Sequence, residues 1–143
     1  GIYRPHLPRH VPKEYFDKFS IETILLPASN ANDLDDIPAK GIEMSDGLTM
    51  KGDYQRIARH ERKGEVVQAY LASINYADQC VGLILDALNN SRYKDNTIVI
   101  LWGDHGWHFA EKLSYRKSKL WEESTRVPLM ISVTGITKPG SRR

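Results

Sequence analysis

The sequence has 143 residues, which is enough for one domain with a hydrophobic core but not comfortably enough for two. Its 41% hydrophobic and 27% charged content is ordinary for a globular protein, and its net charge of +2 argues against a general nucleic-acid or membrane-surface binder. No apolar run is long enough to span a membrane, and a single cysteine, Cys80, excludes both an internal disulfide and a cysteine-based zinc cluster.

The first 62 residues show no sustained periodicity. Residues 1–26 open with "GIYRPHLPRHVP", a loop sequence, because proline removes backbone donors and disfavours helix at the residue before it. The following "PKEYFDKF" (12–19) predicts a short helix with proline in its first turn. We expect residues 27–62 to form an irregular surface region. A loop of that length is unusual in a compact domain unless it is functional or packs against other parts.

The clearest helix is predicted between about Lys63 and Asn90. Apolar residues recur there at a spacing of three and four, from Val67 to Leu88, and form one stripe along the helix. Asp78 falls on that stripe, where a buried carboxylate needs a partner, so we expect it to make a structural hydrogen bond. Cys80 is expected to be a small packing residue on the same helix.

Two continuous apolar runs predict β-strands in the last third of the chain. They are "TIVILW" (97–102) and "RVPLMISV" (126–133), and strands buried on both faces have this composition. The order of helix, strand, loop with a short helix, and strand predicts an α/β architecture in which helices cover a sheet.

The stretch "TIVILWGDHGWH" (97–108) places Asp104 and His105 just after the first strand. Sites in open α/β sheets lie outside the carboxyl ends of the strands, and the flanking Gly103 and Gly106 permit sharp turns and close ligand approach. A carboxylate oxygen and a neutral imidazole nitrogen can ligate a divalent cation together. Two residues cannot fill a coordination shell, so a metal site and a simple capped turn both remain open on this reasoning.

Two further features of this region bear on chemistry. His105 and His108 are three residues apart and could form a zinc pair on a helix, although the glycines weaken a helical placement and no HExxH pattern is present. Residues 112–143 carry eight basic and two acidic side chains, which fits either a local anionic ligand or a solvated basic face. Lys117 could bind and polarise an anionic group beside a metal.

These residues resemble the sulfatase family of the alkaline-phosphatase-like superfamily. The segment "NTIVILWGDHGWHFAEKLSYRKSKLWEESTRVPLMISVTG" (96–135) is similar to the C-terminal catalytic signature of that family. The segments "GIYRPHLPRHVPKEYFDKF" (1–19) and "AYLASINYADQCVGLILDAL" (69–88) resemble its iduronate-2-sulfatase branch. The resemblance implies a three-layer α/β sandwich, with helices packed on a mostly parallel or mixed sheet that is truncated here. Residues 1–143 would be a fragment of one catalytic domain, with residues 63–143 contributing the long helix, both strands and the metal and sulfate loop.

The resemblance also implies roles for individual residues. Asp104 and His105 would be ligands of a calcium ion, which neutralises sulfate charge and activates the nucleophile in such enzymes. Lys117 would contact the sulfate and stabilise the leaving oxygen, and His6 would act there as a hydrogen-bond donor or general acid. Four further residues would line the substrate pocket: Arg4, Trp107, His108 and Arg116.

Two expected parts of a sulfatase have no counterpart in the sequence. The formylglycine nucleophile of the family comes from a Cys/Ser-x-Pro-x-Arg motif, whereas Cys80 lies in "CVGLI" and no serine has that context. The family's adjacent aspartates follow a strand, whereas "DLDDIP" (33–38) does not. We therefore expect the nucleophile to lie outside this chain, in a missing N-terminal half of the catalytic domain, and the chain to be inactive alone. The resemblance implies a sulfated sugar as substrate and an extracytoplasmic location (periplasmic, secreted or lysosomal).

Two other functions remain open at this point. A phosphodiesterase or phosphatase of the same superfamily would keep the Asp-His pair but use a threonine or serine nucleophile and two transition metals. A non-catalytic structural or binding domain would need a stable fold without further chain. An upstream Cys-x-Pro-x-Arg motif would decide for the sulfatase.

Overall fold

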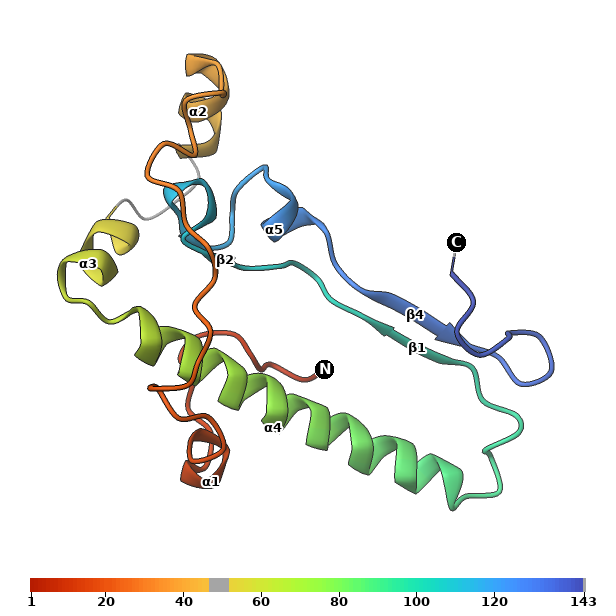
Figure 1. Ribbon diagram of the computed structural model, residues 1–143. Coiled ribbons are helices and arrows are strands. Elements are labelled where there is room, and N and C mark those ends of the chain that lie inside the picture. Colours follow the sequence, from red (N-terminus) through yellow and green to blue (C-terminus); the bar gives the residue numbers. More distant parts are fainter. Residues whose placement is uncertain (47–51, 143) are drawn as a thin grey trace.

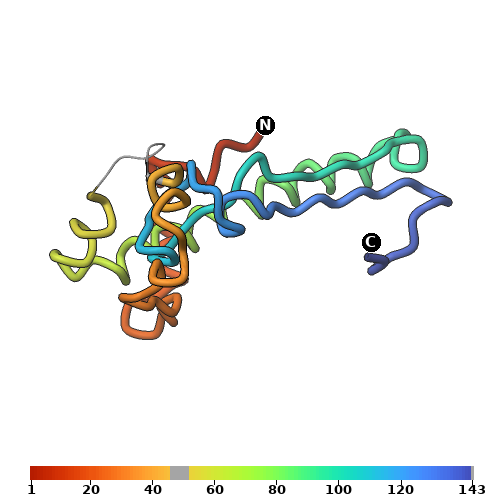
Figure 2. The backbone as a smooth tube through the Cα atoms, turned by 90° about the horizontal axis from the view of Figure 1, so that it is seen from above, coloured from red at the N-terminus to blue at the C-terminus, as the bar shows by residue number. Residues whose placement is uncertain are grey.

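The computed structural model describes residues 1–46 and 52–142, and a single long helix organises them (Figure 1). This helix, α4 (Lys63–Asn89), matches the helix predicted from the apolar stripe. The antiparallel strands β1 (Val99–Trp102) and β4 (Leu129–Ser132) run alongside its second half, as Figures 1 and 2 both show. The N-terminal loop and the short elements gather around its first half. No helix among the described residues is long and apolar enough to cross a membrane.

The short helix α1 (Lys13–Phe16) lies within the predicted helical segment and packs against α4. Tyr15 is its buried anchor: the phenol donates a hydrogen bond to Gln79, and its ring meets Tyr76 edge to face at 5.2 Å. The prediction that Asp78 is buried was wrong, because its side chain is exposed. The second half of α4 is covered on one side only, so a residue on the edge of the apolar stripe stays in water.

The sheet differs from the mostly parallel or mixed sheet that was expected. β1 pairs with β4 in antiparallel register, from Val99 opposite Ser132 to Trp102 opposite Leu129, and each strand is four residues long. Neither strand is buried on both faces: Ile100 is 50% exposed and β4 is exposed throughout. Among the described residues these strands pair only with each other, and a two-stranded ribbon cannot bury both of its faces.

The region 27–62, expected to be irregular, contains two helices. They are α2 (Ala39–Asp46) and α3 (Asp53–Arg59), and the part of the prediction that concerns residues 47–51 lies outside the described residues. Pro38 precedes α2, and its carbonyl oxygen accepts hydrogen bonds from Gly41 and Ile42. Proline is suited to such a helix start because its fixed φ is already helical. The sequence did not predict these helices because the region is rich in residues typical of turns and has no sustained helical periodicity.

A small hairpin lies beside the first half of α4, where the Phe109 ring meets that of Tyr70 at 4.7 Å. It consists of β2 (His108–Phe109), the turn η1 (Glu111–Leu113) and β3 (Tyr115–Arg116), and it is followed by α5 (Glu122–Thr125). His108, Ala110 and Tyr115 are all buried in it. The hairpin therefore forms a compact support from which the chain leads directly into Lys117.

Candidate active site

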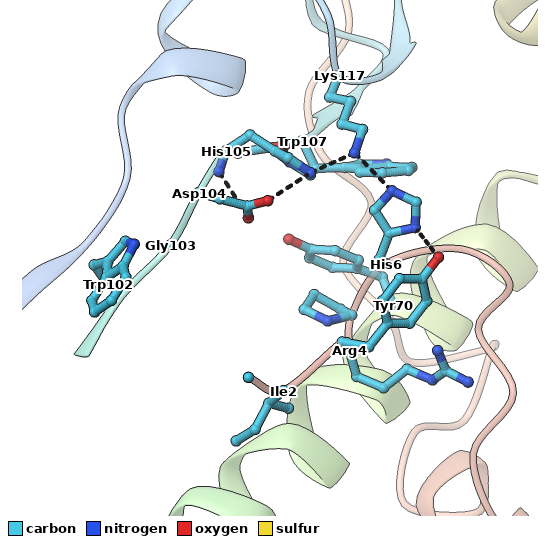
Figure 3. A pocket seen from close by; sticks show the side chains of 14 residues that line it. Ile2, Arg4, His6, Tyr70, Trp102, Gly103, Asp104, His105, Trp107 and Lys117 are labelled. Carbon is cyan, nitrogen blue, oxygen red and sulfur yellow. Dashed lines mark hydrogen bonds and ion pairs between the residues drawn. The ribbon is translucent and has the colours of Figure 1, made fainter. Parts of the chain in front are cut away.

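A pocket of about 540 Å³ opens where three distant segments meet (Figure 3). The N-terminal loop supplies residues 1–6, the end of β1 and the loop after it supply residues 102–107, and Lys117 enters from the end of the hairpin. Tyr70 of α4 completes the lining. The pocket thus lies at the carboxyl end of β1, where sites of α/β proteins form.

Lys117 joins two histidines at the centre of this pocket. Its ammonium nitrogen lies 2.7 Å from Nε2 of His6 and 2.7 Å from Nε2 of His105, as the dashed lines in Figure 3 mark. These contacts cross 111 and 12 positions of the sequence, so only the folded chain creates the cluster. The sequence-predicted residues His6, His105 and Lys117 are therefore brought together.

Hydrogen bonds on the far side of each imidazole assign its tautomer. Nδ1 of His105 lies 2.8 Å from the carbonyl oxygen of Gly106, and Nδ1 of His6 lies 2.7 Å from that of Leu7. A carbonyl oxygen only accepts, so each Nδ1 carries the hydrogen and each Nε2 presents a lone pair to the Lys117 ammonium. The Tyr3 hydroxyl, 2.8 Å from Nδ1 of His6, donates to the same Leu7 carbonyl.

Asp104 lies beside this cluster with its carboxylate largely in solvent. Oδ1 accepts the backbone N–H of His105 at 3.1 Å, and Oδ2 lies 3.7 Å from Nε2 of His105. The Asp104 Oδ2 atom and the His105 Nε2 atom therefore lie on one side, where they could ligate a cation once Lys117 no longer donates to Nε2. No group of three potential ligands among histidine, cysteine, aspartate and glutamate occurs in the described ranges, so a complete shell needs donors from elsewhere.

Backbone contacts hold the loop that carries Asp104 and His105. The N–H of Gly103 donates to the carbonyl of Pro128 at 3.1 Å, and the N–H of Gly106 donates to that of Ser124 at 2.8 Å. A Cβ atom on Gly106 would overlap the backbone carbonyl of Glu123. The glycine is therefore required for close approach of this loop to α5.

An aromatic wall closes the inner side of the pocket. The Trp107 ring stacks on Tyr70 at 6.4 Å and meets His6 edge to face at 6.1 Å. Behind this wall lies the guanidinium of Arg9, within 5.0 Å of both the Tyr70 and Trp107 ring centres. Sequence reasoning predicted Trp107 as a pocket residue but missed Tyr3, Tyr70 and Arg9. Tyr70 had a packing signal on the helix stripe, whereas nothing in the proline-rich loop signals a buried arginine.

Three other predicted pocket residues have different surroundings. Arg4 lines the pocket, but its guanidinium donates to the His10 carbonyl at 2.8 and 3.1 Å and lies against the Tyr3 ring. Arg116 does not line the pocket and pairs with Asp53 instead. His108, also expected to line it, is fully buried in the hairpin, with Nδ1 3.2 Å from the Glu111 carbonyl. It is buried because it alternates with Phe109 along β2 and faces the supporting core.

The buried position of His108 also affects its protonation. Burial lowers the pKa of its imidazole below the ordinary value, although the nearby Glu111 carbonyl and the Glu123 and Glu111 carboxylates oppose the shift. The neutral ring is therefore favoured in the folded hairpin. His108 therefore lies in the core of the hairpin, and the pocket is lined by His105 but not by His108.

Comparison with known proteins identifies the family of this chain. The family described as Sulfatase matches residues 2–143, and the chain belongs to the sulfatase family. A sulfatase of Formosa agariphila is 40% identical over 138 residues, which cover 96% of this chain and 27% of that protein. Iduronate 2-sulfatase of Mus musculus is 32% identical over 155 residues, covering 97% of this chain and 26% of that protein. The chain thus spans about a quarter of the length of these relatives.

A solved structure supports the fold. The structure of BT4656 in complex with its substrate D-glucosamine-2-N,6-O-disulfate matches with a TM-score of 0.65 and 22% identity, over 91% of this chain and 37% of that one. At that identity the likeness establishes the alkaline-phosphatase-like sulfatase fold and nothing finer. The resemblance to sulfatases, including iduronate 2-sulfatases, is therefore confirmed.

Proposed function

We propose that this chain forms one wall of the active site of a longer enzyme, here termed the parent enzyme, which hydrolyses sulfate esters of a sugar. The observation that carries the proposal is the Lys117 ammonium held between the Nε2 atoms of His6 and His105 at 2.7 Å each. Such a cluster at a strand end presents positive charge and hydrogen-bond donors to an anion. Family membership supplies the chemical class of that anion.

The residues of the pocket suit a sulfuric ester as ligand. Asp104 and His105 would hold a calcium ion, which supplies charge neutralisation at the sulfate oxygens and activation of the nucleophile. Lys117 would donate hydrogen bonds to the sulfate oxygens, exchanging its contacts with two imidazoles for contacts with the ligand. A fixed ammonium in a partly enclosed pocket stabilises charge that develops on these oxygens in the transition state.

His6 is proposed to serve the leaving group. When the sulfur–oxygen bond of the ester breaks, its electron pair stays on the alcohol oxygen, which must then gain a proton. Once the Lys117 ammonium has turned to the sulfate, Nε2 of His6 is free in the pocket to carry a proton, and a protonated His6 could then supply it to the leaving oxygen. Tyr3 and the Leu7 carbonyl hold Nδ1 and thereby orient the ring.

The nucleophile is proposed to lie outside this chain. Because the chain spans about a quarter of its curated relatives, the remaining calcium ligands and the formylglycine would come from the other part of the catalytic domain. We therefore expect the 143 residues alone to have no sulfatase activity. By the same resemblance, we propose that the parent enzyme works outside the cytoplasm.

Substitution of Lys117 in the parent enzyme tests this function. We expect Lys117→Met to lower kcat/KM for a sulfate ester by a factor of about 10²–10³, the usual effect of removing one preorganised donor. The matched control is Lys119→Met. Lys119 is two residues away, does not line the pocket, and has its ammonium 3.4 Å from the Ser45 carbonyl oxygen. Steady-state hydrolysis of 4-nitrophenyl sulfate measures both.

The same assay separates the rival functions. Faster hydrolysis of 4-nitrophenyl phosphate than of the sulfate would favour a phosphatase relative. Absence of both activities in a folded parent enzyme with an intact Cys/Ser-x-Pro-x-Arg motif would favour a non-catalytic domain. Equal rates for the Lys117→Met variant and the unsubstituted enzyme would remove the basis of the proposal.

A further inference from the structure

Arg9 lies behind the wall of the pocket rather than in it. The side chain is 9% exposed, and its guanidinium carbon lies 5.0 Å from the ring centre of Tyr70 and 4.8 Å from that of Trp107. A third ring, Phe109, lies 5.5 Å away. Tyr70 and Trp107 both line the pocket, whereas Arg9 does not. The cation is therefore enclosed by aromatic faces, two of which separate it from the ligand space.

No counter-charge accompanies this buried cation in the part of the chain that the structure describes. Nη1 donates to the Val66 carbonyl oxygen at 3.5 Å, Nε and Nη2 are buried without a partner, and no carboxylate pairs with the guanidinium. Buried arginines are otherwise found paired with an acid. Burial lowers the pKa of Arg9 to about 10, which still leaves the side chain protonated at neutral pH.

The position of Arg9 brings its charge near the proposed anion site. Trp107, in contact with the guanidinium, lies 6.1 Å ring to ring from His6, which in turn receives the Lys117 ammonium. A wall of aromatic rings excludes water and dissolved ions, which would otherwise weaken the interaction between two charges. A buried cation therefore attracts an anion over a longer distance than a cation in solvent does. The aromatic faces stabilise the guanidinium but carry no formal charge that would cancel its field.

We propose that the buried positive charge of Arg9 attracts the anionic group across the Trp107 and Tyr70 rings and strengthens its binding without touching it. The inference rests on the proposed function only in that the pocket receives a sulfate group. Lys117 supplies direct hydrogen bonds, and Arg9 supplies a second positive charge from the protein interior. The same guanidinium holds the Trp107 ring as the wall against which the ligand lies.

The test uses two anions of similar size and different charge with the parent enzyme. Inorganic sulfate carries two negative charges and sulfamate carries one. If Arg9 acts only through its charge, removing that charge should change the logarithm of the dissociation constant twice as much for sulfate as for sulfamate. We expect Arg9→Met, which keeps an apolar stem and removes the charge, to weaken sulfate binding about tenfold and sulfamate binding about threefold. Arg9→Lys keeps the charge and should stay within about twofold for both anions. Isothermal titration calorimetry at low ionic strength gives the constants.

Several results would overturn the proposal. One is unchanged binding of both anions by Arg9→Met, and another is an equal loss for both, which would indicate altered packing instead of a lost field. A second neutral variant, Arg9→Gln, is measured in parallel, with thermal unfolding followed for each protein. Failure of both neutral variants to fold, with Arg9→Lys folded, would assign the charge to stability and reject its role in anion binding.

The test of Arg9 can fail or succeed independently of the test for sulfatase activity. Lys117→Met serves as the reference that locates the bound anion in this pocket, because it should abolish sulfate binding. A parent enzyme that shows the Arg9 charge ratio but hydrolyses no sulfate ester keeps the inference and rejects sulfatase activity. A parent enzyme that hydrolyses sulfate esters with no effect of Arg9 on anion binding rejects the inference alone.

Discussion

At the scale of single residues, Lys117 is held by unusual backbone on both sides. Arg116 has φ of 76° and Ser118 has φ of 65°, both in the left-handed region that non-glycine residues rarely adopt. Each such residue costs on the order of 1 kcal/mol and persists only where the surroundings impose it. Arg116 is held in place by the pairing of β3 with β2 and by its ion pair with Asp53. The strand β3 ends at Arg116, and the ammonium of the next residue, Lys117, contacts both histidines.

Gly106 gives the sharpest residue-scale prediction. Its Gly106→Ala variant should lose roughly 2–4 kcal/mol of unfolding free energy, because the new methyl group would overlap a rigid backbone carbonyl in α5. The loop with Asp104 and His105 would be displaced, so sulfate binding should weaken as well. Urea denaturation of the parent enzyme and calorimetric titration with sulfate measure the two effects.

The control for this variant is a glycine with open space around it. Gly82 lies in the interior of α4, and a Cβ there meets nothing within 4 Å, so Gly82→Ala should raise stability by up to about 1 kcal/mol. A Gly106→Ala enzyme as stable as the Gly82→Ala enzyme would show that the loop and α5 are not in rigid contact.

The residues of the site differ in how far the sequence could reveal them. Asp104, His105, Lys117 and His6 were predicted through motif resemblance, and the structure brings the last three into direct contact. Their catalytic and metal-binding roles stay predictions. Arg9 could not be predicted, because its burial results from a contact with rings that lie about 60 and 100 positions further along the chain. Isolated polar residues in loops carry no periodic signal of burial.

At the scale of elements, Asp33 makes the main contact between the region 27–38 and the hairpin. The Asp33 carboxylate accepts the backbone N–H of Lys112 at 2.6 Å, and the Lys112 ammonium donates to the Asp33 carbonyl at 2.7 Å. The backbone hydrogen bond from Lys112 is the main reason why the pKa of Asp33 lies below its ordinary value. Lys112 itself has φ of 49°, so this contact also stabilises a strained turn.

Removing this contact should loosen the hairpin. We expect Asp33→Ala to speed amide hydrogen exchange across residues 109–115 by roughly fivefold, the effect of losing about 1 kcal/mol of local stability. Asp36→Ala is the control, because the Asp36 side chain is 75% exposed and its 3.3 Å ion pair with the same lysine contributes little in water. Exchange measured by mass spectrometry would contradict this view if both variants behaved alike.

The elements also show where sequence patterns suffice. α4, a helix of 27 residues, was predicted almost to the residue because one apolar stripe runs along it from Val67 to Leu88. The short helices α2 and α3 were missed, since seven or eight residues among turn-forming neighbours give no clear period. The strands were located, but their antiparallel pairing and exposure were not predicted. The apolar composition of a strand indicates how buried it is in the complete sheet. It does not show which of the adjacent strands belong to this chain.

At the scale of the whole molecule, the β1–β4 ribbon leaves much apolar surface uncovered. An apolar groove of about 490 Å³ runs between α4 and β1, lined by Val81, Ile84 and Ile100 among others. Trp102 and Leu129, paired across the ribbon, are 66% and 64% exposed. A surface of this kind in a folded protein normally meets another apolar surface. In the parent enzyme we expect the remaining part of the catalytic domain to cover it.

The isolated 143-residue chain should therefore self-associate, since its exposed strand edges and apolar faces can pair with those of another copy. Light scattering coupled to size exclusion should show an apparent mass that rises with concentration. Ile100→Lys on β1 should shift that mass toward the monomer, because a charge placed in the apolar face opposes its burial. Ile136→Lys is the matched control: Ile136 is 78% exposed but lies beyond β4, outside the ribbon, and should not change the mass. A chain that stays monomeric at all concentrations would mean that the ribbon is stable in water, and the apolar groove would then no longer argue for a covering partner domain.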